Sequence, residues 1–172
     1  RRYLIDKKIT PLVRTEAEGE RVKDEGNMRV PIFRAAKIWQ ESTDIFMNPK
    51  ILSIDIETYN PDNKIDMIKN PIIMIGLHGV GLERVITWKK YDKPSPFVEF
   101  AASEGDMLQR MTELILQFEP DMICGYFTDG FDFPYIAERA KHLKISLPLG
   151  LDNSGVEIGG RIGVVGRQVV DD

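Results

Sequence analysis

The chain has 172 residues, 42% of them hydrophobic and 29% charged, which excludes a disordered protein and allows one domain with a sizeable core. The formal net charge is −4, and residues 51–172 hold 19 acidic against 12 basic residues, whereas residues 1–50 are net basic. This balance argues against a general duplex-binding protein, which usually has a basic surface, but a site that gathers carboxylates around divalent cations would tolerate it.

The first 50 residues have an irregular pattern and are expected to form a small, partly β segment. A short apolar element is expected at residues 3–5, followed by a turn at Pro11. Residues 16–25 are charged, which is typical of a loop or an edge hairpin, and residues 35–40 predict a strand.

From Ile51 onward the pattern becomes regular. Residues 51–57 alternate apolar and polar side chains, which predicts a strand with one apolar and one polar face. Residues 71–77 and 83–88 predict two further strands. The glycine-rich residues 79–81 between them predict a hairpin.

Two helices and a fourth strand are expected next. Ser103 is the predicted N-cap of the first helix, with Asp106 as its partner, and Pro120 ends that helix. A strand over residues 121–126 leads to a second helix over residues 131–144. The apolar residues along the first helix recur at helical spacing and predict core positions: Met107, Met111, Leu114 and Phe118. The glycine-rich tail from Gly155 predicts short strands, and the whole pattern indicates an α/β domain with helices packed on one sheet.

Asp55 and Glu57 are the first candidate functional residues, because they are two apart on the predicted strand. Both side chains therefore point to the same face, with Cα atoms ~7 Å apart. Like charges so placed repel each other unless a cation lies between them. A short Asp-x-Glu pattern is a weak signal, however, and taken alone it favours a solvated polar strand face.

Asp132 is the third candidate, at the head of the second predicted helix. It is four residues before the core-facing Ile136, so its side chain is expected to point toward the sheet. A carboxylate that simply caps the helix N-terminus is the alternative.

The order of these motifs resembles the family B DNA polymerases, and the archaeal enzymes most closely. The Asp-Ile-Glu-Thr motif at residues 55–58 and the Phe-Asp-Phe-Pro-Tyr motif at residues 131–135, with a tyrosine five residues before it, are similar to the first two exonuclease motifs of that family. Further segments that resemble the family are residues 2–12, 70–75, 85–89 and 166–171.

The resemblance implies a ribonuclease H-like exonuclease fold, with a mixed central sheet flanked by helices. Residues 1–50 would belong to the N-terminal domain of the polymerase, and residues 51–172 to a 3′–5′ exonuclease domain that is incomplete at its C-terminus. The implied parent enzyme is a DNA-directed DNA polymerase. Its proofreading activity hydrolyses the 3′-terminal phosphodiester of single-stranded DNA by a two-metal reaction.

The resemblance also implies roles for residues and partners. Asp55 would bridge two Mg²⁺ or Mn²⁺ ions, Glu57 would bind one of them and Asp132 the other. Expected partners are a single-stranded 3′ end, primer-template DNA, the remainder of the polymerase chain and, as a further candidate, a sliding clamp. The residues implied to contact DNA are Thr58, Tyr59, Phe127 and Phe131.

Two departures from the family pattern affect the expected activity. The third exonuclease motif, Tyr-x-x-x-Asp on a later helix, is missing from these residues, so we expect weak metal binding and an inactive fragment. Phe127 stands where the family usually has an asparagine. Phe127 therefore favours a lapsed exonuclease-like module that serves a structural or DNA-guiding role, whereas retention of three mutually repelling carboxylates favours an active site. A free-standing ribonuclease of the same fold is disfavoured by the polymerase-like residues 2–12.

The sequence shows neither an apolar run of the ~18 residues that a membrane span needs nor a secretory signal. Cys124 is the only cysteine, so no internal disulfide can form. We expect an intracellular, cytoplasmic protein without a membrane partner, associated with the nucleoid if its source is a prokaryote. Cys124 lies in an apolar stretch and is expected to be buried.

Overall fold

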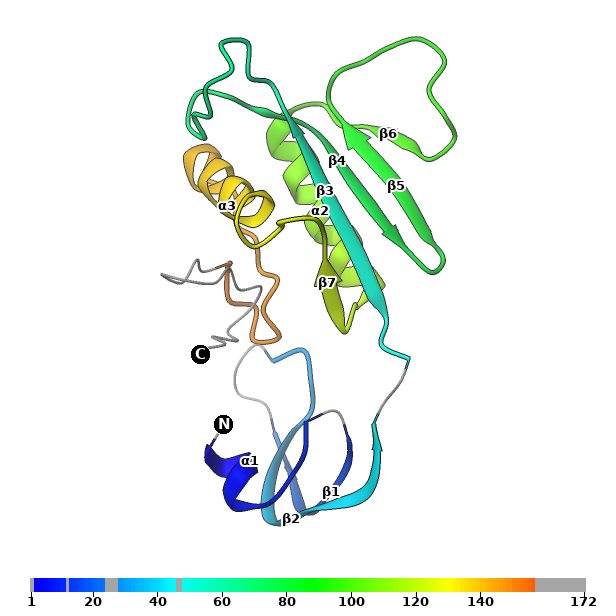
Figure 1. Ribbon diagram of the computed structural model, residues 1–172, viewed down its shortest axis with the longest axis vertical. Coiled ribbons are helices and arrows are strands. Elements are labelled where there is room, and N and C mark those ends of the chain that lie inside the picture. The colour runs from blue at the N-terminus through cyan, green and yellow to red at the C-terminus, as the bar shows by residue number, and fades with distance from the viewer. Residues whose placement is uncertain (1, 12, 24–27, 46–47, 157–172) are drawn as a thin grey trace. The chain divides into compact units, whose positions relative to one another are not determined.

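The structure is a computed structural model that describes residues 2–11, 13–23, 28–45 and 48–156 (Figure 1). Contacts divide the chain into two units, Arg1–Pro49 and Lys50–Asp172. The short strands expected in the glycine-rich tail lie outside the described residues, apart from residues 155 and 156, which form no strand.

The first unit is a short helix followed by a two-stranded antiparallel sheet. Helix α1 spans Arg2–Asp6, strand β1 spans Val13–Val22 and strand β2 spans Ile32–Ile45. Residues 16–25 were expected to form a loop or an edge hairpin. The hairpin is the one that forms, because most of that segment lies in β1. The strand expected at residues 35–40 is the centre of the longer β2.

The second unit contains a mixed five-stranded sheet in the order β6-β5-β4-β3-β7. Its strands are β3 (Ile51–Thr58), β4 (Ile72–Gly79), β5 (Leu82–Thr87), β6 (Val98–Phe100) and β7 (Met122–Cys124). The central strands β3, β4 and β5 are antiparallel neighbours, while β6 pairs parallel to β5 and β7 parallel to β3. The sequence predicted all of these strands except β6, whose three residues are too few for a periodic signal.

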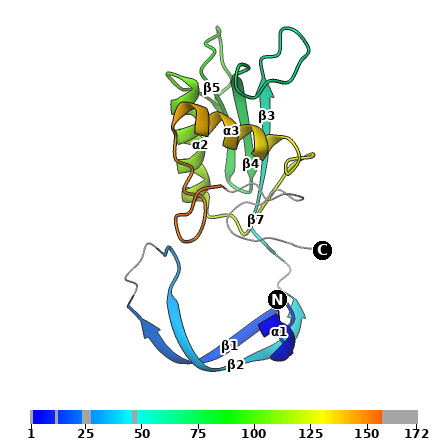
Figure 2. The same ribbon diagram turned by 90° about the vertical axis from the view of Figure 1, so that its left-hand side faces the viewer.

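Two helices cover one face of this sheet, where their buried side chains share one core with those of the strands. Figure 1 shows α2 behind the strands, and Figure 2 shows α3 crossing nearest the viewer. Helix α2 spans Glu104–Phe118, and the Ser103 Oγ accepts a hydrogen bond from the Asp106 N–H at 3.2 Å, as expected for its N-cap. Helix α3 spans Asp132–Leu143. The apolar stripe of α2 and the apolar residues of β3 are buried together in the core: Leu52, Ile54, Ile56, Met107, Met111, Leu114 and Phe118.

The alternation of β3 determines what the other sheet face carries. Because Leu52, Ile54 and Ile56 point to the helices, the side chains between them point to the opposite face and are exposed. Within the described residues, neither α2 nor α3 covers that face. None of the helices in the described residues is long and apolar enough to cross a membrane.

Candidate active site on the open face of the sheet

Strand β3 places Asp55 and Glu57 side by side on the open face. Both residues are exposed, and they lie opposite Gly76 and Met74 of β4. Gly76 has no side chain, so space is left beside the Asp55 carboxylate. The polar strand face predicted from the sequence is therefore present.

Asp132 lies in the first turn of α3, and its side chain contacts the backbone of β3. It is only 2% exposed, and its Oδ1 accepts a hydrogen bond from the Ile56 N–H at 3.0 Å. Ile56 lies between Asp55 and Glu57, so this bond attaches the start of α3 to the strand that carries both other candidates. As expected, the side chain points toward the sheet.

Burial raises the pKa of Asp132, and the negative charge of Asp55 raises it further, while the hydrogen bond from Ile56 opposes both effects. A cation beside Asp55 and Asp132 would relieve this cost, and carboxylate oxygens suit Mg²⁺ or Mn²⁺. The donor chemistry therefore fits a hard divalent cation. The arrangement is incomplete, because within the described ranges no three His, Cys, Asp or Glu side chains are grouped to hold a metal ion.

A groove of about 460 Å³ crosses the open face next to Asp55. We call it the sheet-face groove. Its floor is formed by β3, β4 and β5, and aromatic side chains contribute to its walls. Glu57 and Asp132 do not line it. The residues that line it include Ser53, Asp55, His78, Glu83, Arg84, Val85, Phe97 and Tyr126.

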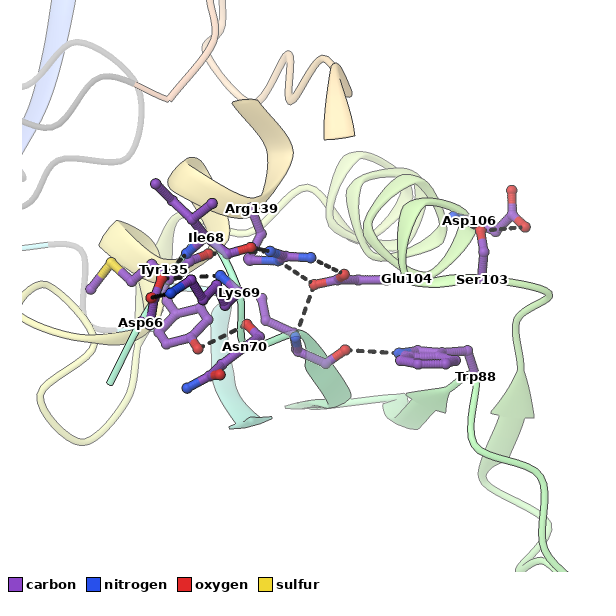
Figure 3. A network of polar contacts seen from close by, with 12 residues as sticks. Asp66, Ile68, Lys69, Asn70, Trp88, Ser103, Glu104, Asp106, Tyr135 and Arg139 are labelled. Atoms are coloured by element: carbon purple, nitrogen blue, oxygen red, sulfur yellow. Dashed lines mark hydrogen bonds and ion pairs between the residues drawn. The ribbon is translucent and has the colours of Figure 1, made fainter. Parts of the chain in front are cut away.

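Arg139 and Glu104 connect the two helices on the covered face (Figure 3). The Arg139 Nε and Nη2 donate to the two Glu104 carboxylate oxygens, at 2.8 and 2.6 Å. Glu104 Oε1 also accepts from the Ile72 N–H at 2.8 Å. The remaining Arg139 nitrogen, Nη1, donates to the carbonyl oxygens of Met67 and Ile68. The ion pair therefore holds α2, α3, the start of β4 and the connection between β3 and β4 together.

A second set of bonds holds the same β3–β4 connection, residues 59–71. The Tyr135 hydroxyl donates to the Asn70 carbonyl oxygen at 2.9 Å. The Asn70 side-chain amide donates to the Lys64 carbonyl oxygen at 2.7 Å and to the Asn60 side chain, which in turn donates to the Thr58 hydroxyl at 2.9 Å. The chain is thus fixed directly after the carboxylate-bearing strand.

Sequence reasoning missed this network, although a signal for it was present. Asp132, Tyr135 and Arg139 are separated by three and four residues, so they share one helix face with the buried Ile136 and Ala140. An arginine at an inward-facing helix position needs a buried partner. That requirement pointed to an acidic residue such as Glu104.

The sequence model for the family described as "DNA polymerase family B, exonuclease domain" matches residues 1–166, nearly the whole chain. This chain belongs to that family. DNA polymerase 1 of Pyrococcus abyssi is 38% identical over 173 residues, which cover 94% of this chain and 18% of the relative. The DNA polymerase of Pyrococcus glycovorans is 42% identical over 124 residues, which cover 66% of this chain and 16% of the relative.

The family B DNA polymerase from the hyperthermophilic archaeon Pyrobaculum calidifontis has a similar solved structure, with a TM-score of 0.75 at 24% identity. The alignment covers 96% of this chain and 20% of that polymerase. The expected ribonuclease H-like exonuclease fold is thereby confirmed. The exonuclease-family chain spans about a fifth of the length of these polymerases.

The four residues expected to contact DNA differ in their surroundings in this exonuclease-family chain. Tyr59 is 56% exposed, directly after β3. Thr58 is half-buried and its hydroxyl is bonded to Asn60. Phe131 packs against the core, with its ring centroid 5.4 Å from that of Tyr135. Tyr59 therefore remains available for a base, whereas Phe131 is mainly a packing residue.

The Phe127 ring neither lines the sheet-face groove nor is buried in the core. Its ring is 66% exposed and is not among the groove-lining residues. The ring lies over Gly130, where an added Cβ would overlap the Phe127 Cζ. The backbone of Phe127 is in the left-handed region, with φ of 57°. Asparagine adopts this conformation more readily than phenylalanine does. The backbone conformation is therefore one reason for an asparagine at this position in the family.

The expectation that Cys124 is buried was wrong. Cys124 is exposed on β7, and its Sγ lies 3.5 Å from the Ser53 Oγ. In the described part of the sheet β7 is an outer strand, and Cys124 pairs with Ser53, which points to the open face. The apolar sequence around Cys124 reflects β propensity here, not enclosure by the core.

Proposed function

We propose that this chain is part of a longer family B DNA polymerase and carries its 3′–5′ proofreading exonuclease. In this proposal residues 1–50 belong to the N-terminal domain and residues 51–172 to the exonuclease domain. The family match and the fivefold greater length of the relatives support it. The observation that carries the proposal is the Ile56–Asp132 hydrogen bond, because it joins the two exonuclease-like motifs in space.

Asp55, Glu57 and Asp132 would hold two Mg²⁺ or Mn²⁺ ions. Bound ions of this kind lower the pKa of an attacking water and stabilise the leaving 3′-oxygen at phosphorus. The chain itself holds these residues in position. Asp132 is fixed by Ile56, the Thr58 hydroxyl by the network that ends on Asn70, and the Tyr59 backbone by the Pro71 carbonyl oxygen. The exposed Tyr59 ring would then stack on the terminal base without reading its identity.

The proposed substrate is the frayed, single-stranded 3′ end of primer-template DNA, shortened by one nucleotide at a time during DNA replication inside the cell. The remainder of the polymerase chain would supply the third exonuclease motif, the nucleotide-binding polymerase site and any contact with a sliding clamp. The relatives are named DNA polymerases, which supports the assignment of these functions to the remainder of the polymerase chain.

A lapsed exonuclease module is the second candidate. Two observations favour it. Phe127 stands at the family's asparagine position, and within the described residues no three His, Cys, Asp or Glu side chains are grouped to hold a metal ion. Against it, burial raises the pKa of Asp132 and the negative charge of Asp55 raises it further, a cost that a bound cation would offset.

The test is single-turnover digestion of 3′-labelled single-stranded DNA by the complete polymerase with Mg²⁺. Asp55→Ala and Asp132→Ala are expected to lower the rate at least ~100-fold, as loss of a charge-stabilising group does. Glu138→Gln on the same helix as Asp132 is the matched control and should leave the rate unchanged.

The outcome also separates the two candidates. A wild-type polymerase that extends primers but does not digest single strands would support the lapsed module. The 172 residues alone are expected to show little or no digestion, because the third motif is missing; robust Mg²⁺-dependent digestion by them would contradict the proposed need for that motif.

A further inference from the structure

The connection between β5 and β6, residues 88–97, concentrates positive charge in an otherwise acidic part of the chain. We call it the basic aromatic loop. It holds three of the 12 basic residues of residues 51–172, namely Lys89, Lys90 and Lys93, and one acidic residue, Asp92. All three lysines are exposed. Figure 1 shows the loop extending from the end of the sheet at which β5 ends.

Aromatic side chains alternate with these lysines. The Lys89 Nζ lies 3.7 Å from the centroid of the Trp88 ring, which places the cation on the ring face. Tyr91 is 49% exposed, and its ring stands edge-on to Phe100 with 5.6 Å between centroids. A surface that binds single-stranded nucleic acid has two components. Cationic side chains lie along the phosphate backbone, and aromatic rings that are held in place stack on the bases.

The basic aromatic loop begins at the same end of the sheet as the candidate site. Glu57 is opposite Met74 of β4, and Met74 is opposite Thr87, the last residue of β5. Adjacent strands lie ~4.8 Å apart, so the loop leaves the sheet about 10 Å from Glu57. One or two nucleotides of an extended single strand span that distance.

Two contacts fix the loop relative to Tyr59. The Tyr59 N–H donates to the Pro71 carbonyl oxygen at 3.0 Å, and the Trp88 Nε1 donates to the Ile72 carbonyl oxygen at 2.8 Å. The two aromatic residues are therefore anchored to consecutive residues at the start of β4. At its other end the loop contributes Phe97 to the sheet-face groove, which Asp55 also lines.

We propose that the basic aromatic loop binds single-stranded DNA a few nucleotides before the 3′ terminus, with Lys89 and Lys90 on phosphates and Tyr91 against a base. This inference rests on the proposed exonuclease function, and extends it by assigning the path of the strand. Unpaired DNA is the favoured ligand because stacking on Tyr91 requires a base that is free of its complement. The loop then acts on substrate affinity and not on the hydrolytic step.

The first experiment measures binding of a fluorescein-labelled oligo(dT) 16-mer to the complete polymerase in EDTA, by anisotropy over a series of salt concentrations. Lys89→Gln/Lys90→Gln is expected to weaken binding at least about fivefold and to lower the slope of log K against log[salt] by ~1.4, or ~0.7 for each phosphate that the protein no longer neutralises. Lys37→Gln/Lys141→Gln is the matched control. Both control lysines are exposed, and Lys37 also lies over a tryptophan, with 5.1 Å from its Nζ to the Trp39 centroid.

The second experiment follows digestion of the same oligonucleotide with Mg²⁺. Lys89→Gln/Lys90→Gln is expected to raise KM with little change in kcat. Tyr91→Ala should raise KM at least about fivefold, and Tyr91→Phe should restore it, because stacking needs the ring and not the hydroxyl. A role of Tyr91 in folding alone would lower the amount of active enzyme and leave KM unchanged.

The results separate this inference from the function on which it rests. If the wild-type enzyme digests the strand and the loop variants match the control variant, the loop inference is overturned. Equal weakening of duplex and single-strand binding also overturns it, because the loop would then be a general polyanion surface. If no enzyme digests DNA but the loop variants still lose affinity in EDTA, the proposed function fails and the loop assignment stands.

Discussion

Arg139 and Glu104 form a two-point ion pair in which both side chains are more than nine-tenths buried. The bonds to Glu104 raise the pKa of Arg139. The pair also binds backbone groups of residues 67, 68 and 72, so it fixes the position of the β3–β4 connection. Its removal should affect both stability and the shape of the chain after β3.

Arg139→Met is expected to lower the free energy of unfolding by ~3–5 kcal/mol, because it leaves the buried Glu104 carboxylate uncompensated. Arg110→Met is the control, since Arg110 pairs with Glu99 at 2.6 Å in a partly exposed position and should cost less than ~1 kcal/mol. Denaturant unfolding of the two variants measures the difference. Equal losses would contradict a structural role for burial of the Arg139 pair.

Asp132→Asn tests the cost of ionising a buried carboxyl. Because burial and Asp55 raise the pKa of Asp132 above its unfolded value, the folded state binds the proton more readily, and Asp132 contributes most stability at low pH. That contribution falls as the pH rises through the folded pKa. The neutral asparagine should therefore increase the free energy of unfolding at pH ~7 and change it little near pH ~3.5. Unfolding curves at both pH values check this sign, and a variant less stable than wild type at neutral pH would refute it.

Gly125→Ala is expected to disrupt the turn that leads to Asp132. An added Cβ would lie 2.5 Å from the Ile54 carbonyl oxygen and closer still to the Thr128 Oγ1, and the strand backbone cannot move aside. We expect a loss of ~1–3 kcal/mol, typical of overpacking. Gly130→Ala is the matched case, because its Cβ would meet chiefly the exposed Phe127 ring, which can rotate. Thermal unfolding should show a clear loss for the first variant and a small one for the second.

Phe127→Asn is expected to stabilise the protein, since the left-handed conformation costs a side chain such as phenylalanine ~1–2 kcal/mol and asparagine less. Phe127→Ala removes the ring and keeps the backbone cost, so it should not reproduce the gain. Denaturant midpoints measure this. In the complete polymerase, a rise in exonuclease rate of up to ~10²-fold with Phe127→Asn would indicate that the amide also helps position reacting groups.

The sequence was sufficient to predict most of the second unit. The alternation of β3 predicted which carboxylates share a face, and the helical spacing around Ile136 predicted that Asp132 points to the sheet. These signals are local, because each depends on neighbouring residues within one element. The fold class followed from their order along the chain.

Features that depend on distant partners were not predictable in the same way. The Arg139–Glu104 pair joins residues 35 apart, and the Asn70 bonds depend on the path of a loop. Cys124 was misjudged because an apolar sequence does not show whether its strand is central or outermost. The position of Phe127 depends on a backbone angle, which side-chain patterns do not encode.

The order of the five-stranded sheet has a consequence for solubility during folding. In the described residues both outer strands, β6 and β7, are three residues long, while the three strands between them have six to eight. An edge strand exposes unpaired backbone groups on which a second chain can add a strand, and very short edges limit that addition. Each outer strand pairs with three residues of the longer strand beside it and itself offers only a short edge, which disfavours strand addition at these two edges.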